Sequence, residues 1–315
     1  MSMDDFYKNV FEIIESFREN YNEVIRDTCK NSNREVEILI GILNNWIDAA
    51  KLFKEYKTEE IIHNVQGIFF SYFWRGSCWI IYEALTGHYF EAFRDLRFMF
   101  EGSLQALMYD YLIEREILEK FGFYVKFDVK VEIIELAEEL REKIRQLGDG
   151  YVTHEKLRDI TRGKVEDFVR SKGVRLDEEE RKKYIEVYSE VLAQPELYYS
   201  VPKHITEFVR ECGLEEFEEK LKKAWAELCL YTHFSRKFFK WIMKRPQEIW
   251  VEEYNEELLK KFCELYIIVN DLLFSTLLLG YPKLREVVSD IVKWWMENFS
   301  IKLEMTEKML SNLIN

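Results

Sequence analysis

Residues 89–101 read YFEAFRDLRFMFE, and this stretch decides the fold of the chain around it. At 100° per residue, one narrow arc of a helix takes the side chains of Phe93, Arg97, Phe100, Leu104, Leu107 and Tyr111. The spacing predicts a long helix whose apolar stripe carries one charge, the guanidinium of Arg97. Burying an unpaired charge costs several kcal/mol or more, so Arg97 needs a partner, and Glu101 lies one turn further on. We expect that breaking this buried pair in Arg97→Ala costs about 3–5 kcal/mol.

The composition of the whole chain also favours helices. Its 315 residues include only 4 prolines and 12 glycines, so long stretches contain no residue that breaks a helix. Hydrophobic residues make up 48% and aromatic residues 16%, enough for a sizeable core. We predict an all-α protein, a helical bundle built from both halves of the chain with a charged insertion. The predicted parts are an N-terminal bundle (1–147), a charged insertion or subdomain (148–201) and C-terminal helices that pack on the bundle (202–315).

Apolar residues recur at helical spacing along most of the chain. The predicted helices cover 3–29, 34–56, 58–85, 89–121, 128–147, 214–244, 247–280 and 283–298, with one more that ends near Ala193 and a short one at 305–314. Gly87 is the predicted C-terminal cap of the third helix. The most apolar stretches, 67–85 and 266–282, contain charged residues, so we interpret both as buried helices and not as membrane spans.

Charge and cysteine usage exclude several classes of protein. The net charge of −13 argues against a generally basic, nucleic-acid-binding surface. Charged residues make up 33% of the chain and are rich in Glu and Lys, which is typical of thermophilic archaea or bacteria.

The 5 cysteines form no C-x-x-C pair, and the histidines form no metal motif, so we predict no metal and no cofactor. Reduced thiols and the lack of a signal-peptide pattern predict a cytoplasmic protein.

Four charged residues follow one side of the helix at spacings of three and four residues: Glu91, Arg94, Arg97 and Glu101. One interpretation is a structural ion-pair network that ties helices together. The other is an anion-binding or catalytic site, because the fork of a guanidinium suits a phosphate.

A second polar cluster, Tyr231-Thr232-His233-Phe234-Ser235, interrupts the apolar helix predicted at 214–244. His233 makes either an interhelical hydrogen bond or a general acid–base pair with Arg97 across the bundle. Ser235 is a weaker candidate for a nucleophile, because no nucleophile-elbow glycines flank it. The candidate catalytic residues are Arg97, Glu101 and His233, and the candidate binding residues add Arg94, Tyr231 and Ser235.

Together these segments resemble a pattern in a group of prokaryotic all-helical proteins of unknown function. The matching stretches are Gly87-His88-Tyr89-Phe90-Glu91-Ala92 with Arg97 and Glu101, and Tyr231 to Ser235. That group is loosely similar to the HEPN superfamily of helical nucleotide-binding and ribonuclease domains. The resemblance implies a ribonuclease or nucleotide-binding protein of a stress or defence system. HEPN ribonucleases carry an Arg and a His a few residues apart on one helix, whereas here Arg97 and His233 belong to two predicted helices.

The middle of the chain holds a basic segment, with seven basic residues against three acidic ones between Lys156 and Arg175. We predict two short helices on either side of Gly163, a size compatible with a helix-turn-helix. The nucleic-acid candidates are Lys156, Arg158, Arg162, Lys164, Arg170, Lys172 and Arg175. We favour a solvated surface of mixed charge over a nucleic-acid footprint, because the acidic residues dilute the patch.

Near the C-terminus, two adjacent tryptophans stand with a set of apolar residues: Trp294 and Trp295, then Phe299, Ile301, Leu303, Met305 and Met309. Adjacent residues cannot share one face of a helix, so one tryptophan meets another element or a second copy of the chain. A homodimer through this segment is one prediction, and packing in the core is the alternative.

No complete catalytic motif is present in the sequence. The leading hypothesis is therefore a helical binding or interaction protein. The HEPN-like ribonuclease or nucleotide-binding protein is the alternative. A small-molecule pocket inside the bundle is the third hypothesis.

Overall fold

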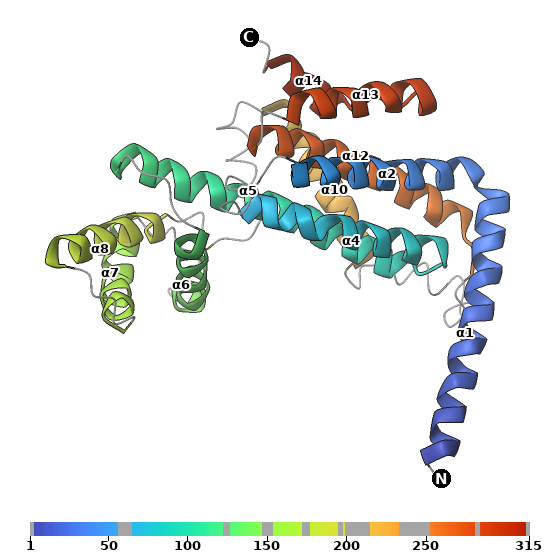
Figure 1. Cartoon of the computed structure of the whole chain (residues 1–315), viewed down its shortest axis with the longest axis horizontal. Coiled ribbons are helices and arrows are strands. Elements are labelled where there is room, and N and C mark those ends of the chain that lie inside the picture. The colour runs from blue at the N-terminus through green and yellow to red at the C-terminus, as the bar shows by residue number, and fades with distance from the viewer. Residues whose placement is uncertain are drawn as a thin grey trace. The chain divides into compact units, whose positions relative to one another are not determined.

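The structure, a computed structural model, describes residues 3–55, 65–121, 127–146, 154–171, 177–194, 198, 215–232, 243, 253–280 and 284–312. Within these ranges the regular elements are helices and no strand occurs, which confirms the predicted all-α class (Figure 1). The helices are α1 (Met3–Asn31), α2 (Asn33–Glu55), α4 (Val65–Leu85), α5 (Tyr89–Phe121), α6 (Phe127–Arg145), α7 (His154–Ser171), α8 (Glu178–Leu192), α10 (Glu215–Thr232), α12 (Glu256–Gly280), α13 (Arg285–Phe299) and α14 (Glu304–Asn312). None of these described helices combines the length and the apolar character needed to cross a bilayer.

The chain divides into two compact units. The first comprises residues 1–55, 70–102 and 216–315, and the second comprises 56–69 and 103–215. Both ends of the chain therefore contribute to the first unit, as a helical body built from both halves requires. The predicted insertion, 148–201, lies inside the second unit, which is larger because it also takes α6 and the second half of α5.

Helix α12 forms the centre of the first unit and packs against α2, α13 and α14 (Figure 1). The interpretation of 266–282 as a buried helix is confirmed for residues 269–278, which are all buried, whereas Ile268 is 37% exposed. The same interpretation of 67–85 is wrong in part, because Trp79 is 57% exposed and Tyr82 is 41% exposed. The ring of Trp46, from α2, stacks on Phe274 with 4.4 Å between ring centroids. Its indole N–H donates a hydrogen bond to the side-chain oxygen of Asn270, so a polar contact also fixes the register of α2 on α12.

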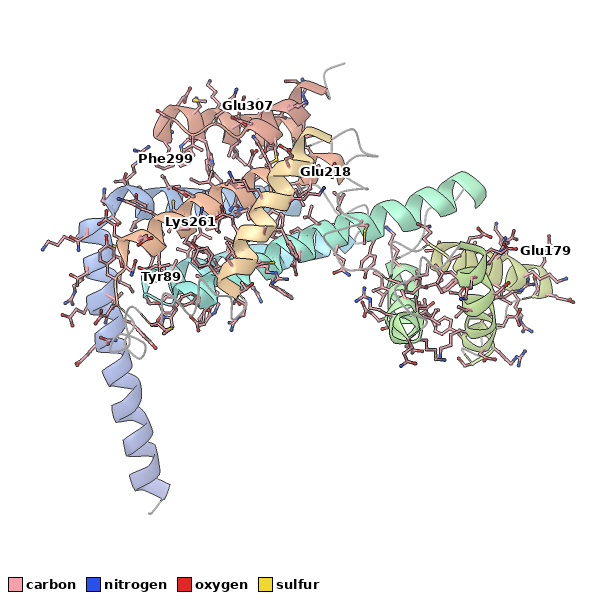
Figure 2. All side chains as sticks on the ribbon, turned by 180° about the vertical axis from the view of Figure 1, so that it is seen from behind. Tyr89, Glu179, Glu218, Lys261, Phe299 and Glu307 are labelled. Carbon is pink, nitrogen blue, oxygen red and sulfur yellow. The ribbon has the colours of Figure 1, made fainter. Side chains whose placement is uncertain are left out.

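The start of α12 differs from the prediction. The sequence pattern extends the helix back to residue 247, but residues 253–255 are not helical and α12 begins at Glu256. Asn255 explains the difference, because its side-chain oxygen accepts a hydrogen bond from the backbone N–H of Leu258 at 3.0 Å and caps the helix. The backbone N–H of Asn255 in turn donates to the hydroxyl of buried Tyr89, at the start of α5 (Figure 2).

A tight turn at Gly87 joins α4 to α5, as predicted. Gly87 has φ 87°, a left-handed conformation that side chains rarely adopt. A Cβ at this position would lie 2.9 Å from the carbonyl oxygen of Glu253. Both the conformation and the close approach of the backbone therefore require glycine. The turn brings α4 and α5 together, and Gly76 of α4 lies against the side chain of Met99 of α5.

The second unit has its own core, in which α8 packs against α6 and α7 (Figure 1). The prediction of two short helices around Gly163 is wrong, because α7 continues through Gly163 without a break. A glycine inside a helix costs only about 1 kcal/mol, and Leu157 and Val165, one on each side of Gly163, are both fully buried in this core. Their burial outweighs the weak point in the helix.

Candidate functional site

Arg97 lies between α5 and α10 and has the partner that the sequence predicts. Its Nε donates to Oε1 of Glu101 at 2.7 Å, one turn along α5. Its Nη1 donates to the hydroxyl of Thr232, at the end of α10, at 2.9 Å. The pairing with Glu101 is confirmed, and the bond to Thr232 ties α5 to α10.

Trp225 of α10 completes this network. The indole N–H of Trp225 donates to the same oxygen of Glu101, at 2.6 Å. The guanidinium carbon of Arg97 also lies 5.4 Å from the centre of the Trp225 ring, a cation–π contact. Three N–H donors and two oxygen acceptors, on four side chains of two helices, thus pair with one another.

The burial of this network is partial. The side chain of Arg97 is 18% exposed and that of Glu101 is 26% exposed. Water therefore reaches the pair, and its charges are less desolvated than the helical wheel suggests. The contacts fit the structural interpretation, an ion pair that ties helices together, because each named group has a partner inside the protein.

The other residues predicted for this site are in different places. Arg94 turns away from the network, since its side chain is 62% exposed and pairs with Asp95 at 3.0 Å. Tyr231 stacks on Phe93 with 4.2 Å between ring centroids, and burial raises its pKa. His233 and Ser235 lie outside the described residues.

The basic residues of α7 are largely paired with carboxylates of the same unit. Arg158 contacts Glu190 of α8 at 2.6 Å, and Lys164 contacts Glu139 of α6 at 2.8 Å. The hydrogen bond and charge of Glu139 raise the pKa of Lys164. Within the same helix, Arg162 contacts Glu166 at 3.4 Å, and Lys156 and Arg170 also lie on α7. Lys172 and Arg175 lie outside the described residues. These ion pairs favour the mixed-charge interpretation of the segment.

The C-terminal aromatic segment packs within the chain. Trp295 is fully buried, and Leu303, Met305 and Met309 are buried with it. Trp294 meets α2, where its ring and that of Phe299 lie close to Gly41. The two tryptophans thus use both sides of α13 for contacts with other helices of the same unit.

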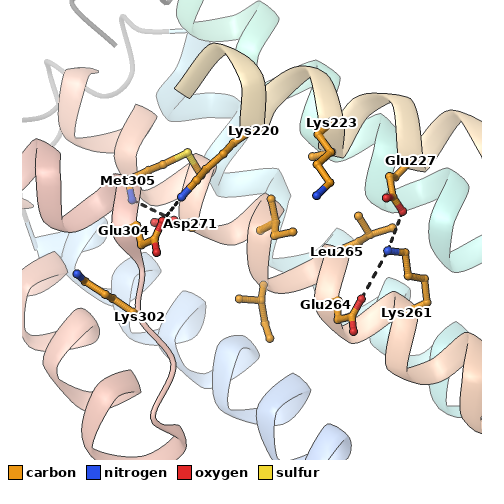
Figure 3. A pocket seen from close by; sticks show the side chains of 13 residues that line it. Lys220, Lys223, Glu227, Lys261, Glu264, Leu265, Asp271, Lys302, Glu304 and Met305 are labelled. Carbon is orange, nitrogen blue, oxygen red and sulfur yellow. Dashed lines mark hydrogen bonds and ion pairs between the residues drawn. The ribbon is translucent and has the colours of Figure 1, made fainter. Parts of the chain in front are cut away.

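A cleft of about 380 Å³ opens in the first unit between α10, α12 and the segment that leads into α14 (Figure 3). This volume lies within the usual range of small-molecule sites. Its floor is partly apolar, with Ala224, Leu265 and Ile268 among the lining residues. Charged side chains surround that floor: Lys220, Lys223, Glu227, Lys261, Glu264, Asp271, Lys302 and Glu304.

Two of the cleft lysines bridge different elements. Lys261 of α12 contacts Glu227 of α10 at 2.7 Å and Glu264 of its own helix at 3.5 Å (Figure 3). Burial lowers the pKa of Lys261, but the hydrogen bond and charge of Glu227 outweigh that effect and raise it. Lys220 of α10 pairs with Glu304 at the start of α14, and this contact lowers the pKa of Glu304.

The other two lysines differ in their pairing. Lys302 contacts Glu307 at 3.5 Å. Lys223 is exposed, extends toward α12 in Figure 3, and makes no ion pair within the part of the chain that the structure describes. It is the one cleft lysine in these ranges without a carboxylate partner.

Asp271 lies at one end of the cleft and caps α14. The residue is 6% exposed, and its carboxylate accepts hydrogen bonds from the backbone N–H groups of Met305 at 3.1 Å and Thr306 at 3.0 Å. The Thr306 hydroxyl adds a bond at 2.8 Å. Burial raises the pKa of Asp271, although these hydrogen bonds oppose the shift. A carboxylate from α12 therefore neutralises the unpaired N–H groups at the start of α14.

No pattern in the sequence indicates this cleft. Its lysines and glutamates have the spacing of an ordinary solvated helix face, and the helices that carry them are distant in sequence. Only Asp271 gave a signal, as a charge inside an apolar stretch.

Among the described residues, no group of three or more histidine, cysteine or acidic side chains is placed to hold a metal ion. No family model, curated protein or solved structure matches this chain.

Proposed function

We propose that this protein is a ligand-binding protein and that the cleft between α10, α12 and the start of α14 is its binding site. The observation that carries the proposal is the convergence of charged side chains from three elements around a partly apolar floor. A few oriented polar groups over an apolar surface are the usual composition of a small-molecule site. The proposal keeps the leading hypothesis from the sequence, a helical binding protein. It places the binding site in the cleft and not at Arg97.

A cleft-filling substitution tests the proposal. Ile268 lines the cleft and is 37% exposed, so Ile268→Trp fills the space without changing the charge. Ile40 on α2 lies outside the lining residues and has nearly the same exposure, 39%, so Ile40→Trp is a matched control. We would measure thermal shifts against a panel of anionic, neutral and cationic small molecules. We expect ligands that stabilise the wild type and Ile40→Trp but not Ile268→Trp, and equal shifts in all three proteins would contradict the proposal.

The HEPN-like ribonuclease is a second candidate function. It is favoured by the hydrogen bond between Arg97 and Thr232, because Thr232 belongs to the predicted polar cluster that also includes His233. The test compares RNA cleavage by the wild type and by His233→Ala. Cleavage that is lost in the variant supports this function, whereas equal cleavage, or none in either protein, removes it.

A further inference from the structure

We infer that the ligand of the cleft is an anion, a small molecule with a carboxylate or phosphate group that Lys223 binds. This inference rests on the proposed function of the cleft. It follows from which of the charged side chains that line the cleft already have a partner and which do not.

Carboxylates in the cleft already have cations or hydrogen-bond donors. Glu227 and Glu264 share Lys261, and Glu304 holds Lys220. The carboxylate of Asp271 accepts two backbone N–H groups and one hydroxyl. A cationic ligand would have to share these oxygens with the partners that they already hold, which weakens its attraction to the cleft.

Lys223 is in the opposite situation. Its ammonium lines the cleft, and within the described ranges no carboxylate pairs with it. Glu227, one turn further along α10, is occupied by Lys261. An anion in the cleft would complete the pairing without breaking any contact already made, and a charge-assisted hydrogen bond is among the stronger contacts available to a ligand.

Size also limits the ligand. A space of about 380 Å³ is near the lower end of the range for small-molecule sites, so a compact acid fits it better than a large cofactor. Ala224, Leu265 and Ile268 would contact the carbon part of such an acid. The same ammonium would bind a carboxylate or a phosphate, and the experiment separates the two.

The test uses three compounds of one length and different charge: succinate, butane-1,4-diol and butane-1,4-diamine, with inorganic phosphate as a fourth probe. We would titrate each into the 315-residue protein by calorimetry at low and moderate salt. We expect succinate or phosphate to bind, and the stronger of the two identifies the anion. Binding of the diol or diamine alone would overturn the inference while leaving the cleft as a binding site. If none of these probes binds, the inference is overturned. The thermal-shift panel of anionic, neutral and cationic molecules, with Ile268→Trp, then tests the proposed function separately.

Variants of Lys223 and of its neighbour Lys222 test whether Lys223 binds the anion. We expect Lys223→Ala to weaken anion binding by tenfold or more and Lys223→Arg to retain it within about threefold, because the arginine keeps the charge. Lys222→Ala is the control, since Lys222 is an exposed neighbour that pairs with Glu218 outside the cleft. Anion affinity that is unchanged in Lys223→Ala, or reduced equally in Lys222→Ala, would overturn the assignment.

Discussion

Arg97 shows how one misplaced charge in a sequence locates a contact between helices. Its position on an apolar stripe required a partner, and spacing along the helix named Glu101. Thr232 and Trp225 could not be named in the same way, because they lie on α10, more than one hundred residues further along the chain. Spacing within a helix reveals neighbours at three and four residues, but partners on another helix follow from tertiary packing.

The structure lowers the expected cost of Arg97→Ala. The side chain is 18% exposed, so water can solvate Glu101 and Thr232 after the guanidinium is removed. We expect Arg97→Ala to lower the free energy of unfolding by about 1.5–3 kcal/mol, the range for hydrogen bonds to charged groups. Arg94→Ala is the control, because Arg94 is 62% exposed and should cost about 0.5 kcal/mol or less. Urea titration monitored by circular dichroism measures both, and equal losses would show that the network adds no stability.

Glu83 is the residue for which we expect a pH effect. It is 7% exposed, its Oε2 lacks a hydrogen-bond partner among the described residues, and burial and the nearby charge of Asp95 raise its pKa from 4.5 to about 7. The neighbouring Glu91 raises the pKa further, whereas Arg94 and the hydrogen bond from Trp79 lower it. The folded protein therefore keeps a proton on Glu83 at pH values where the unfolded chain has lost it.

The sign of the effect on stability follows from that difference. The contribution of neutral Glu83 is fully present below pH 4.5 and is lost as the pH rises from 4.5 to about 7. Glu83→Gln cannot titrate, so we expect the variant to show no such loss. The free energy of unfolding of the wild type, minus that of the variant, should therefore fall by about 1–2 kcal/mol as the pH rises across this window. Unfolding free energies at several pH values measure it, with exposed Glu286→Gln as the control. A difference that stays flat between pH 4.5 and 7 would contradict the assignment.

At the scale of the helices, sequence patterns predicted elements well where local signals exist. The range 89–121 matches α5, and Gly87 marks the turn before it, because a glycine with positive φ is a local requirement. The errors came from signals that compete. Gly163 suggested a break in α7, but packing of the core on both sides of the glycine keeps the helix continuous. The apolar pattern placed the start of α12 too early, because Asn255 caps the helix and it begins at the next residue.

The docking of α14 depends on a side chain of another helix. Asp271 of α12 accepts both backbone N–H groups at the start of α14, so we expect Asp271→Asn to cost about 1–2 kcal/mol, the range for a lost cap and its charge. Hydrogen exchange should accelerate at residues 305–312 more than elsewhere. Asp290→Asn, on an exposed position of α13, is the control. Unchanged protection of α14 would mean that apolar packing of Met305 and Met309 holds the helix without the cap.

For the whole molecule, the sequence predicted the class and the joining of both chain halves, but not the extent of the second unit. The charge pattern marked 148–201 as different, whereas the unit comprises 56–69 and 103–215, and its second stretch begins inside the uninterrupted helix α5. No change of composition accompanies that boundary, because a helix that passes from one core to another keeps the same apolar spacing. The cleft was missed for the related reason that three elements, far apart in sequence, must come together to form it.

The C-terminal segment tests the oligomeric state. Its residues Trp295, Leu303, Met305 and Met309 are buried in the first unit, and Met296, 41% exposed, is the most exposed of its large apolar side chains. A stable dimer needs an interface of at least about 1,000 Å² in total, which a single exposed methionine does not supply. We expect Met296→Glu to leave the molar mass of the 315-residue protein, measured by light scattering, unchanged. A fall from the mass of two chains to that of one would instead identify this face of α13 as the subunit interface.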